Sequence, residues 1–381
     1  MSSALPAQSS ESVRLKLTPS ELAANLKICF AARRSVMVHG DPGIGKSQIV
    51  QQVADAMFAR KYDFDYTGGV VRPVVVTKKG SNVLGEPLGP SDPRPWFRDI
   101  RAALLDAVDL RGLPMVEDGK AKWAIPDFLP TDPRGGVVFF DEINRGSEMT
   151  MNGLFSLAIP PHTLGEFHLN PAWIPASAVN DQDVGARRMS SALLARFIHL
   201  ELGGTPDAKW LDDVCKLAVT RDWHPMVIAF LRSFTKMLHQ YDPKARVSPN
   251  PRGWEFVSDV MKQDPSPTQL FSLVAGQVGE AAAREFCAFA ALFRKLPSLD
   301  NILTNPKTAD VPSNPSVMYA IVATLARRAT TKNFTQVLTY LDRVPVEFNV
   351  ACVVDAVRRT NELQYEPAYT KWAIAHGEVG L

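Results

Sequence analysis

Residues 35–49, which read SVMVHGDPGIGKSQI, decide how the rest of this 381-residue sequence is interpreted. Residues 40–47 match the pattern G-x-x-x-x-G-K-[ST] of a phosphate-binding loop. The apolar run 36–38 before them is typical of a buried parallel strand, and residues 46–60 carry apolar side chains on one face of a helix. Strand, loop and helix follow in the order that the motif requires, so we expect a nucleotide phosphate site here.

The residue types in the loop suit phosphate chemistry. Gly43 and Gly45 let the backbone curl so that N–H groups point at phosphate oxygens, at the positive end of the following helix. Lys46 brings a charge to the β- and γ-phosphates, and Ser47 offers a hydroxyl to Mg²⁺. The loop recognises phosphates and not the base, so it does not distinguish ATP from GTP. The residues expected to contact the nucleotide are Gly40, Asp41, Pro42, Gly43, Ile44, Gly45, Lys46, Ser47 and Gln48.

A second motif is residues 135–142, GGVVFFDE, in which four apolar residues precede two carboxylates. This pattern predicts a strand that is buried on both faces, with Asp141 and Glu142 at its carboxyl end. Ligands of open α/β sheets bind at that end of the strands. We therefore expect Asp141 to hold Mg²⁺ together with Ser47, and Glu142 to act as the general base that polarises the attacking water.

The composition is that of an ordinary soluble globular protein, with 46% hydrophobic and 22% charged residues. Residues 1–13 carry no signal-peptide pattern, and we expect a disordered leader there. No apolar run has the length of a membrane helix, so we expect a cytoplasmic protein without a membrane partner. The formal charge of +2 is too small to indicate a nucleic-acid partner. The cysteines, which show neither metal nor disulfide spacing and are expected to be buried thiols, are Cys29, Cys215, Cys287 and Cys352.

Strands interleaved with helices predict a five-stranded parallel sheet in the first half of the chain. The further strands are expected at residues 97–105, 173–180 and 198–202. Pro175 has no amide hydrogen for a central strand, which predicts a bulge there. Thr18 and Glu21 form a capping box that begins a helix ending near Arg33. Further helices are expected at residues 126–129, 148–157 and 190–195.

Two hairpins are predicted, at residues 115–123 around an Asp-Gly pair and at residues 163–169. Residues 63–95 form a long insertion of unknown role, in which residues 70–76 are a candidate hairpin arm.

From residue 204 onward the strand patterns disappear, and proline-rich separators divide helical segments. The sequence therefore predicts a leader (1–13), an α/β nucleotide-binding core (14–203) and an α-helical lid with a C-terminal helical extension (204–381), whose task the sequence does not indicate. The helices expected in the last part are residues 209–219, 226–239, 251–261, 267–293, 317–328, 335–344 and 348–362.

These motifs, in this order, resemble those of an AAA+ ATPase. Residues 109–112 (DLRG), 141–145 (DEINR) and 190–197 (SSALLARF) resemble the strand-2 motif, the extended Walker B motif and the arginine-finger box of the MoxR-like branch. The hairpin before Asn180 resembles the pre-sensor-1 hairpin of that superclade, and residues 248–254 resemble the start of a sensor-2 helix. The resemblance covers residues 35–202 and implies an AAA+ P-loop NTPase core with an α-helical lid.

The resemblance implies roles for three further residues. Asn180 would be sensor 1, which orients the water or the γ-phosphate. Arg196 would be the arginine finger that reaches into the neighbouring subunit's site, with Arg187 and Arg188 as alternatives. Arg252 would be sensor 2, which touches the γ-phosphate from the lid.

The function implied by the resemblance is ATP hydrolysis, with ATP and Mg²⁺ as cofactors, coupled in a chaperone-like way to the remodelling or activation of a partner protein. A finger supplied in trans requires a homo-oligomeric ring, expected to be a hexamer, and accelerates comparable phosphoryl transfers by about 10³–10⁵. The two hairpins are candidates for the central pore, and plain surface hairpins are the alternative. The resemblance also implies a partner that carries a von Willebrand factor A domain.

Other functions remain open at the level of sequence. A nucleic-acid-translocating motor, a helicase or restriction-type NTPase, belongs to the same AAA+ branch, but the near-neutral charge counts against it. A nucleotide-gated scaffold is disfavoured by the intact Asp141–Glu142 pair. Residues 181–183 are Asp-Gln-Asp where MoxR proteins usually have Asn-Pro, which weakens the sensor-1 assignment.

Overall fold

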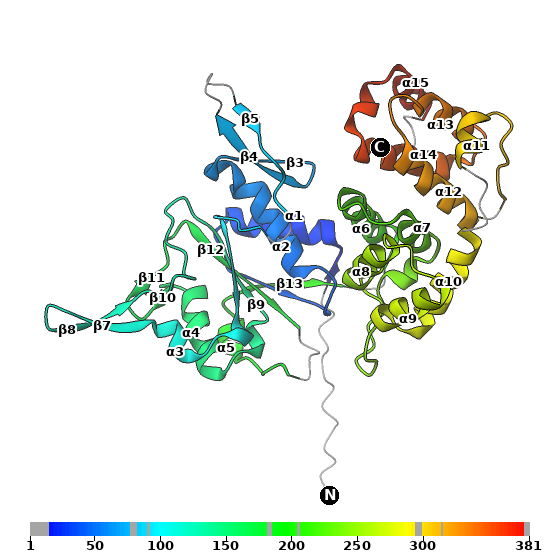
Figure 1. Ribbon diagram of the computed structural model, residues 1–381. Helices are drawn as coiled ribbons and strands as arrows, with labels where there is room; N and C mark the ends of the chain where they lie inside the picture. The colour runs from blue at the N-terminus through cyan, green and yellow to red at the C-terminus, as the bar shows by residue number, and fades with distance from the viewer. Residues whose placement is uncertain are drawn as a thin grey trace, which may run out of the picture. The chain divides into compact units, whose positions relative to one another are not determined.

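The computed structural model describes residues 15–76, 82–89, 92–180, 185–203, 206–293, 299–313 and 315–376. The expected leader (1–13) and residues 181–183 lie outside the described residues. The chain forms two compact units, which are described separately (Figure 1). The first contains the chain up to Gly40, Lys46–Asp65 and Arg72–Gly204, and the second contains Asp41–Gly45, Tyr66–Val71 and the chain from Thr205 onward.

A six-stranded sheet, in which neighbouring strands pair in parallel, is the centre of the first unit. The α/β fold class is therefore confirmed. All five predicted strands are present, and the two-residue β1 adds a sixth at the edge. The strands, in sheet order, are β1 (Lys16–Leu17), β13 (Ile198–Leu202), β2 (Val36–His39), β12 (Trp173–Val179), β9 (Gly136–Asp141) and β6 (Phe97–Arg101).

Helices cover both faces of this sheet, with α1 (Pro19–Ala31) and α2 (Lys46–Phe58) on one side and α4 (Glu148–Ala158) on the other (Figure 1). The α4 face packs Met37, Val138 and Phe140 against Leu154 and Phe155. The central strands β2, β12 and β9 are buried along their length, as their apolar runs predict. The carboxyl ends of these strands consequently meet at one edge of the sheet.

Local chemistry explains where the elements of the core begin and end. Thr18 and Glu21 form the predicted capping box at the start of α1. The bulge expected at Pro175 is wrong, because the register with β9 runs through Pro175 without a break. Pairing of β12 with β2 begins only at Ala176, so Pro175 has a neighbouring strand on one side only, a position that proline tolerates.

Two other predictions in the core need correction. The strand expected over residues 97–105 ends at Arg101, and a 3₁₀-helix (Ala102–Leu104) follows it. The helix expected over residues 126–129 is a turn, in which the Leu129 amide donates to the Pro126 carbonyl.

Both predicted hairpins are present, as β7 (Leu113–Glu117) with β8 (Lys120–Ala124) and β10 (Thr163–Leu164) with β11 (Phe167–His168). The hairpin β7–β8 follows the short helix α3 (Ala107–Arg111).

The insertion contains a three-stranded sheet of its own and is fixed to the helix that follows the phosphate loop. Its strands are β3 (Phe64–Thr67), β4 (Val70–Val76) and β5 (Asn82–Leu84). Arg94, at the end of the insertion, donates to both carboxylate oxygens of Asp55 on α2 at 3.0 and 3.1 Å, and Trp96 Nε1 donates to the same carboxylate at 2.9 Å. The Arg94 and Asp55 side chains are only 8% and 5% exposed, so this is a buried ion pair.

The second unit is helical in the part of the chain from Thr205 that the structure describes. Gly279, with φ of +86°, interrupts the helix expected over residues 267–293, and the helix expected over 226–239 ends at Ser233. None of the described helices has the length and apolarity that crossing a membrane requires. The helices are α6 (Ala208–Thr220), α7 (Pro225–Ser233), α8 (Pro251–Met261), α9 (Pro267–Val278), α10 (Glu280–Phe293), α11 (Leu299–Thr304), α12 (Pro315–Arg328), α13 (Phe334–Leu341), α14 (Val346–Arg359) and α15 (Pro367–His376).

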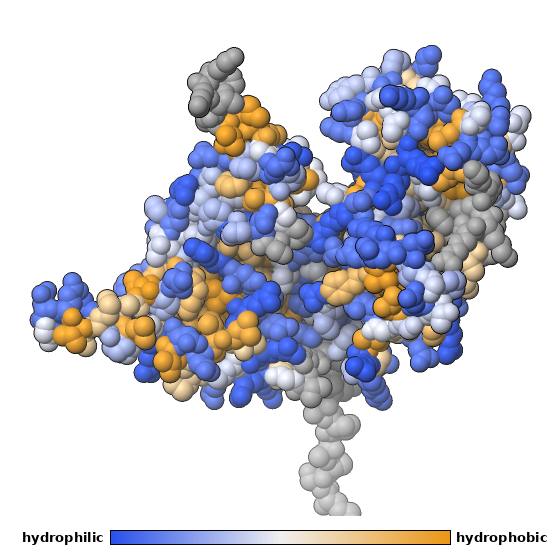
Figure 2. All heavy atoms as spheres, in the orientation of Figure 1, coloured by the Kyte–Doolittle hydropathy of each residue, from blue (hydrophilic) through white to orange (hydrophobic). Residues whose placement is uncertain are grey.

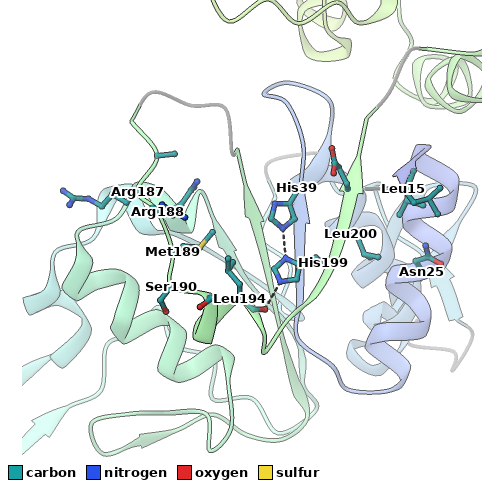
Figure 3. A pocket seen from close by; sticks show the side chains of 15 residues that line it. Leu15, Asn25, His39, Arg187, Arg188, Met189, Ser190, Leu194, His199 and Leu200 are labelled. Atoms are coloured by element: carbon teal, nitrogen blue, oxygen red, sulfur yellow. Dashed lines mark hydrogen bonds between the residues drawn. The ribbon is translucent and has the colours of Figure 1, made fainter. Parts of the chain in front are cut away.

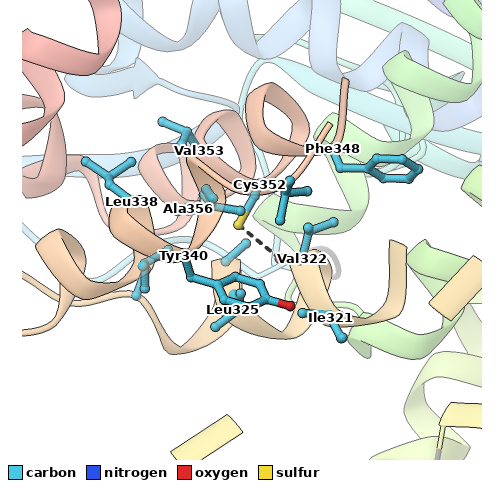
Figure 4. Close-up of a cluster of buried hydrophobic side chains, with 14 of the residues drawn as sticks. Ile321, Val322, Leu325, Leu338, Tyr340, Phe348, Cys352, Val353 and Ala356 are labelled. Carbon is cyan, nitrogen blue, oxygen red and sulfur yellow. Dashed lines mark hydrogen bonds between the residues drawn. The ribbon is translucent and has the colours of Figure 1, made fainter. Parts of the chain in front are cut away.

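Two apolar clusters stabilise this helical unit. The Phe230 ring of α7 packs against Trp254 of α8 and Phe286 of α10, with ring centroids 5.2 Å apart in both pairs. A second cluster joins α12, α13 and α14, where the Cys352 thiol points at the Val322 carbonyl, 3.2 Å away (Figure 4).

The cysteine prediction is largely confirmed. Cys29, Cys215 and Cys352 are buried free thiols, and burial raises the pKa of each of them. Cys287 is partly exposed.

We expect the substitution Arg94→Met to lower the free energy of unfolding by about 3–5 kcal/mol, because it leaves the buried Asp55 carboxylate without its charged partner. Urea denaturation followed by circular dichroism measures this difference. The control is Lys122→Met, which removes the exposed pair of Lys122 with Glu117 and should cost below about 1 kcal/mol. Equal effects of the two substitutions would contradict the anchoring role of Arg94.

Candidate functional site

The phosphate loop connects β2 to α2 with the backbone geometry that its glycines permit. Gly43 and Gly45 have φ of +77° and +97°, which side chains with a Cβ rarely adopt. A Cβ on Gly43 would also lie 2.3 Å from Oδ1 of Asn250, which belongs with it to the second unit. Ile44 is buried, and Lys46 begins α2. The first turn of α2 therefore presents backbone N–H groups at the edge of the sheet, as an anion site requires.

Lys46 is held close to the loop. Its Nζ donates to the carbonyl oxygen of Gly40 at 2.6 Å. A phosphate oxygen in the loop would compete with this carbonyl for the ammonium group, and a charged acceptor makes the stronger hydrogen bond.

The two sequence motifs meet at Ser47 and Asp141, which are 94 positions apart in the chain. Ser47 Oγ donates to Asp141 Oδ2 at 3.2 Å. Burial, and then the charge of Asp99 on the neighbouring strand β6, raise the pKa of the Asp141 carboxyl. A hydroxyl and a carboxylate are hard oxygen donors, and Mg²⁺ commonly takes only one or two protein ligands and completes its shell with phosphates and water. The pair therefore fits Mg²⁺ bound together with a polyphosphate.

Glu142 lies beside this pair in a left-handed backbone conformation, with φ of +47° and ψ of +43°. Its amide donates to Asp141 Oδ1 at 3.1 Å. The Glu142 carboxylate accepts a hydrogen bond from Arg145 at 3.1 Å, and both side chains are exposed. Glu142 would have to leave Arg145 in order to polarise a water molecule at the phosphate.

Asn180 follows β12 at the same edge, next to the strand that carries Asp141. Its carbonyl accepts a hydrogen bond from the side chain of Asn144 at 3.2 Å. Asn144 is 3% exposed, and its own carbonyl accepts from the Arg187 amide at 2.8 Å. Asn144 therefore connects the turn after Asp141 with both Asn180 and the segment that carries the candidate fingers.

The three candidate fingers, Arg187, Arg188 and Arg196, are exposed on a segment that contains the short helix α5 (Ser191–Leu194). The guanidinium of Arg196 donates to the Ala192 carbonyl at 2.6 Å, within its own turn. Arg187 and Arg188 line a pocket of about 1330 Å³ together with His39 and His199 (Figure 3).

Arg252 lies in the second unit, at the start of α8, where Asn250 is the N-cap. The Arg252 amide donates to the Gly43 carbonyl at 3.2 Å, and both residues line a pocket of about 380 Å³. In the same unit, the buried His239 lies 2.9 Å from the carboxylate of Asp41, between Nε2 and Oδ2. The structure thus places Arg252 beside the tip of the phosphate loop, with which it shares a compact unit.

Sequence reasoning missed three residues that contact the expected site residues or influence them electrostatically, namely Asp99, Asn144 and His239. Asn144 lies within residues 141–145, directly after the two carboxylates. A polar residue at that position was the only feature of the sequence that could have indicated its role. Asp99 and His239 reach the site through tertiary contacts that no spacing in the sequence indicates.

No protein-family model matches this chain, and no curated protein matches it. Among solved structures, it is similar to a mutant of RuvB from Thermotoga maritima, at 16% identity over 93% of this chain and 94% of that chain, with a TM-score of 0.34. It is also similar to NtrX from Brucella abortus in complex with ATP, at 12% identity over 92% of this chain and 69% of that chain, with a TM-score of 0.38. Likenesses at this level assign no activity, so the function rests on the residues of the chain itself.

We expect Asp141→Asn to raise the Mg²⁺ concentration needed for half-maximal binding of a fluorescent ATP analogue by about tenfold or more, because an amide oxygen lacks the charge that holds the cation. A Mg²⁺ titration at fixed nucleotide measures the change. The matched control is Asp127→Asn, an exposed carboxylate of the same unit, which should leave the titration unchanged. An unaltered Mg²⁺ requirement in Asp141→Asn would remove Asp141 from the metal site.

Proposed function

We propose that this chain is a MoxR-type AAA+ ATPase that hydrolyses ATP in a homo-oligomeric ring, with a hexamer as the expected form. The observation that carries the proposal is the hydrogen bond between Ser47 and Asp141, because it joins the phosphate loop to the Asp-Glu strand at the edge where ligands of such sheets bind. Lys46 and Glu142 lie at the same edge, so the groups needed for phosphate binding and water activation converge there.

In this proposal the loop amides and Lys46 hold the triphosphate, and Ser47 and Asp141 hold Mg²⁺. The cation, when bound, neutralises charge on the phosphate oxygens. Glu142 leaves Arg145 and accepts a proton from the attacking water, while Asn180 orients that water or the γ-phosphate. Arg252 senses the γ-phosphate beside Gly43.

The exposure of Arg196 supports the proposed ring. Its side chain is exposed, and within the described part of the chain its guanidinium is bonded to its own turn. An exposed arginine of this kind is free to reach the nucleotide of a neighbouring copy and to stabilise transition-state charge there. Arg187 and Arg188 stay as alternatives, since they are exposed on the same segment.

The proposed work of the ring is to remodel or activate a partner protein in the cytoplasm. The hairpin β7–β8 supports this role, because Leu113 is 72% and Val116 is 82% exposed. Figure 2 shows orange hydrophobic residues gathered along this hairpin. Phe167 of the hairpin β10–β11 is buried instead. We therefore assign client contact to β7–β8, and the sequence resemblance points to a partner with a von Willebrand factor A domain.

The test is the ATPase rate per subunit measured against protein concentration, for the wild type, Glu142→Gln and Arg196→Ala. We expect turnover to rise with concentration, and each substitution to lower it, Arg196→Ala by about 10³-fold or more. Arg134→Ala, an exposed arginine of the same unit, serves as the control and should retain activity.

Mixed rings distinguish a shared site from a site within one chain. Arg196→Ala subunits keep an intact Glu142, and Glu142→Gln subunits keep an intact finger, so mixing the two inactive proteins should restore part of the hydrolysis. Turnover that is constant down to monomer concentrations, together with no restoration on mixing, would contradict the ring.

A further inference from the structure

Two histidines that the proposed function does not use lie together at the start of the phosphate loop. His39 is the last residue of β2, directly before Gly40, and is 5% exposed. His199 lies on the neighbouring strand β13. His39 Nε2 and His199 Nδ1 are 2.7 Å apart, and the two ring planes are tilted by 39° (Figure 3).

The contact on the other side of His199 limits how the two rings can bond to each other. His199 Nε2 is 2.7 Å from the carbonyl oxygen of Leu194. A carbonyl only accepts hydrogen bonds, so His199 Nε2 carries a hydrogen and donates it. In a neutral imidazole the other nitrogen, Nδ1, is then an acceptor, and His39 Nε2 donates to it. The two histidines thus form a chain of hydrogen bonds from β2 to Leu194.

Leu194 is the last residue of α5, shortly before Arg196 in the chain. Its carbonyl also accepts the Phe197 amide at 3.1 Å, and the Arg196 amide donates to Leu193 at 3.1 Å. The place of the Leu194 carbonyl therefore fixes the turn from which the Arg196 side chain projects. At the other end of the segment, the backbone carbonyl of Asn144 accepts a hydrogen bond from the Arg187 amide. The finger segment is consequently bonded to the edge of the nucleotide site at both ends.

The other end of the histidine chain adjoins the nucleotide. Gly40, the residue after His39, accepts a hydrogen bond from Lys46. A triphosphate that takes Lys46 would remove this partner from the Gly40 carbonyl, one residue after His39 in the chain. His39 is thus placed to respond to occupancy of the phosphate loop.

We propose that His199, oriented by His39, is a positioning residue for the trans-acting finger. Occupancy of one subunit's phosphate loop would then set the position of the arginine that this subunit offers to its neighbour. This inference rests on the proposed function, because it requires a finger that acts on a second copy of the chain.

The experiment compares His199→Leu, His39→Leu and His39→Gln in the full-length chain. We expect both leucine variants to lower kcat by about 10–100-fold, since displacing a catalytic group by about 1 Å costs about 10²-fold, while affinity for ATP changes less than about twofold. The His39→Gln variant keeps a donor near the position of Nε2 and should retain most of kcat. The matched control is His168→Leu, an exposed histidine on β11, which should behave as the wild type.

Mixed rings provide the readout that a merely structural role would not change. His199→Leu subunits keep Lys46, Asp141 and Glu142 intact, so Glu142→Gln subunits should rescue their hydrolysis by supplying a correctly placed finger. A failure of rescue here, alongside rescue of Arg196→Ala, would place the defect in the subunit's own site and overturn the inference alone.

The remaining outcomes are also decisive. If Arg196→Ala itself is not rescued, the shared site fails, and the inference fails with it. If His39→Gln loses as much kcat as His39→Leu, the hydrogen bond is not what matters, and the inference is overturned. Analytical ultracentrifugation with ATP checks assembly, and loss of rings in His199→Leu would equally contradict a role in positioning.

Discussion

The burial of three parallel strands makes the hydrogen bond between Ser47 and Asp141 possible. The rest of the site depends on that hydrogen bond. Strands β2, β12 and β9 are buried on both faces, so their carboxyl ends are fixed side by side. The first helical turn after β2 and the carboxylate after β9 are thereby brought within 3.2 Å of each other. Burial also raises the pKa of Asp141, because it disfavours the charged carboxylate. A bound cation would stabilise this charged form.

The parts of the fold that local chemistry determines could be predicted from the sequence. The glycines of the phosphate loop, the capping box at Thr18 and the turn at Asp118-Gly119 each depend on neighbouring residues, and each has the expected geometry; Asp118 and Gly119 have φ of +55° and +72°. The strand before Asp141 was predictable for the same reason, since its apolar run is continuous.

The features that could not be predicted depend on contacts between distant segments. The absence of a bulge at Pro175 depends on where β2 begins to pair with β12, which no local pattern indicates. His39 and His199 are 160 positions apart in the chain, and their contact depends on the register between β2 and β13. The break at Gly279 is different, because a glycine that ends a helix is a local signal. The continuous apolar pattern of residues 267–293 led instead to the prediction of one long helix.

The phosphate loop also belongs to both compact units, since Gly40 and Lys46 group with the core and Asp41–Gly45 group with the helical unit. Within the helical unit, His239 lies 2.9 Å from the Asp41 carboxylate, and the Arg252 amide donates to the Gly43 carbonyl.

In the proposed function, the loop and the Asp-Glu strand bind MgATP. The most direct test is equilibrium binding of a fluorescent ATP analogue to the wild type and to Lys46→Ala, with Mg²⁺ and with EDTA. We expect saturable binding by the wild type that is tighter with Mg²⁺, and a loss of affinity of about tenfold or more in Lys46→Ala, because removing this charge-assisted contact costs about 1.5–3 kcal/mol. Equal affinities of the two proteins, unaffected by Mg²⁺, would contradict it.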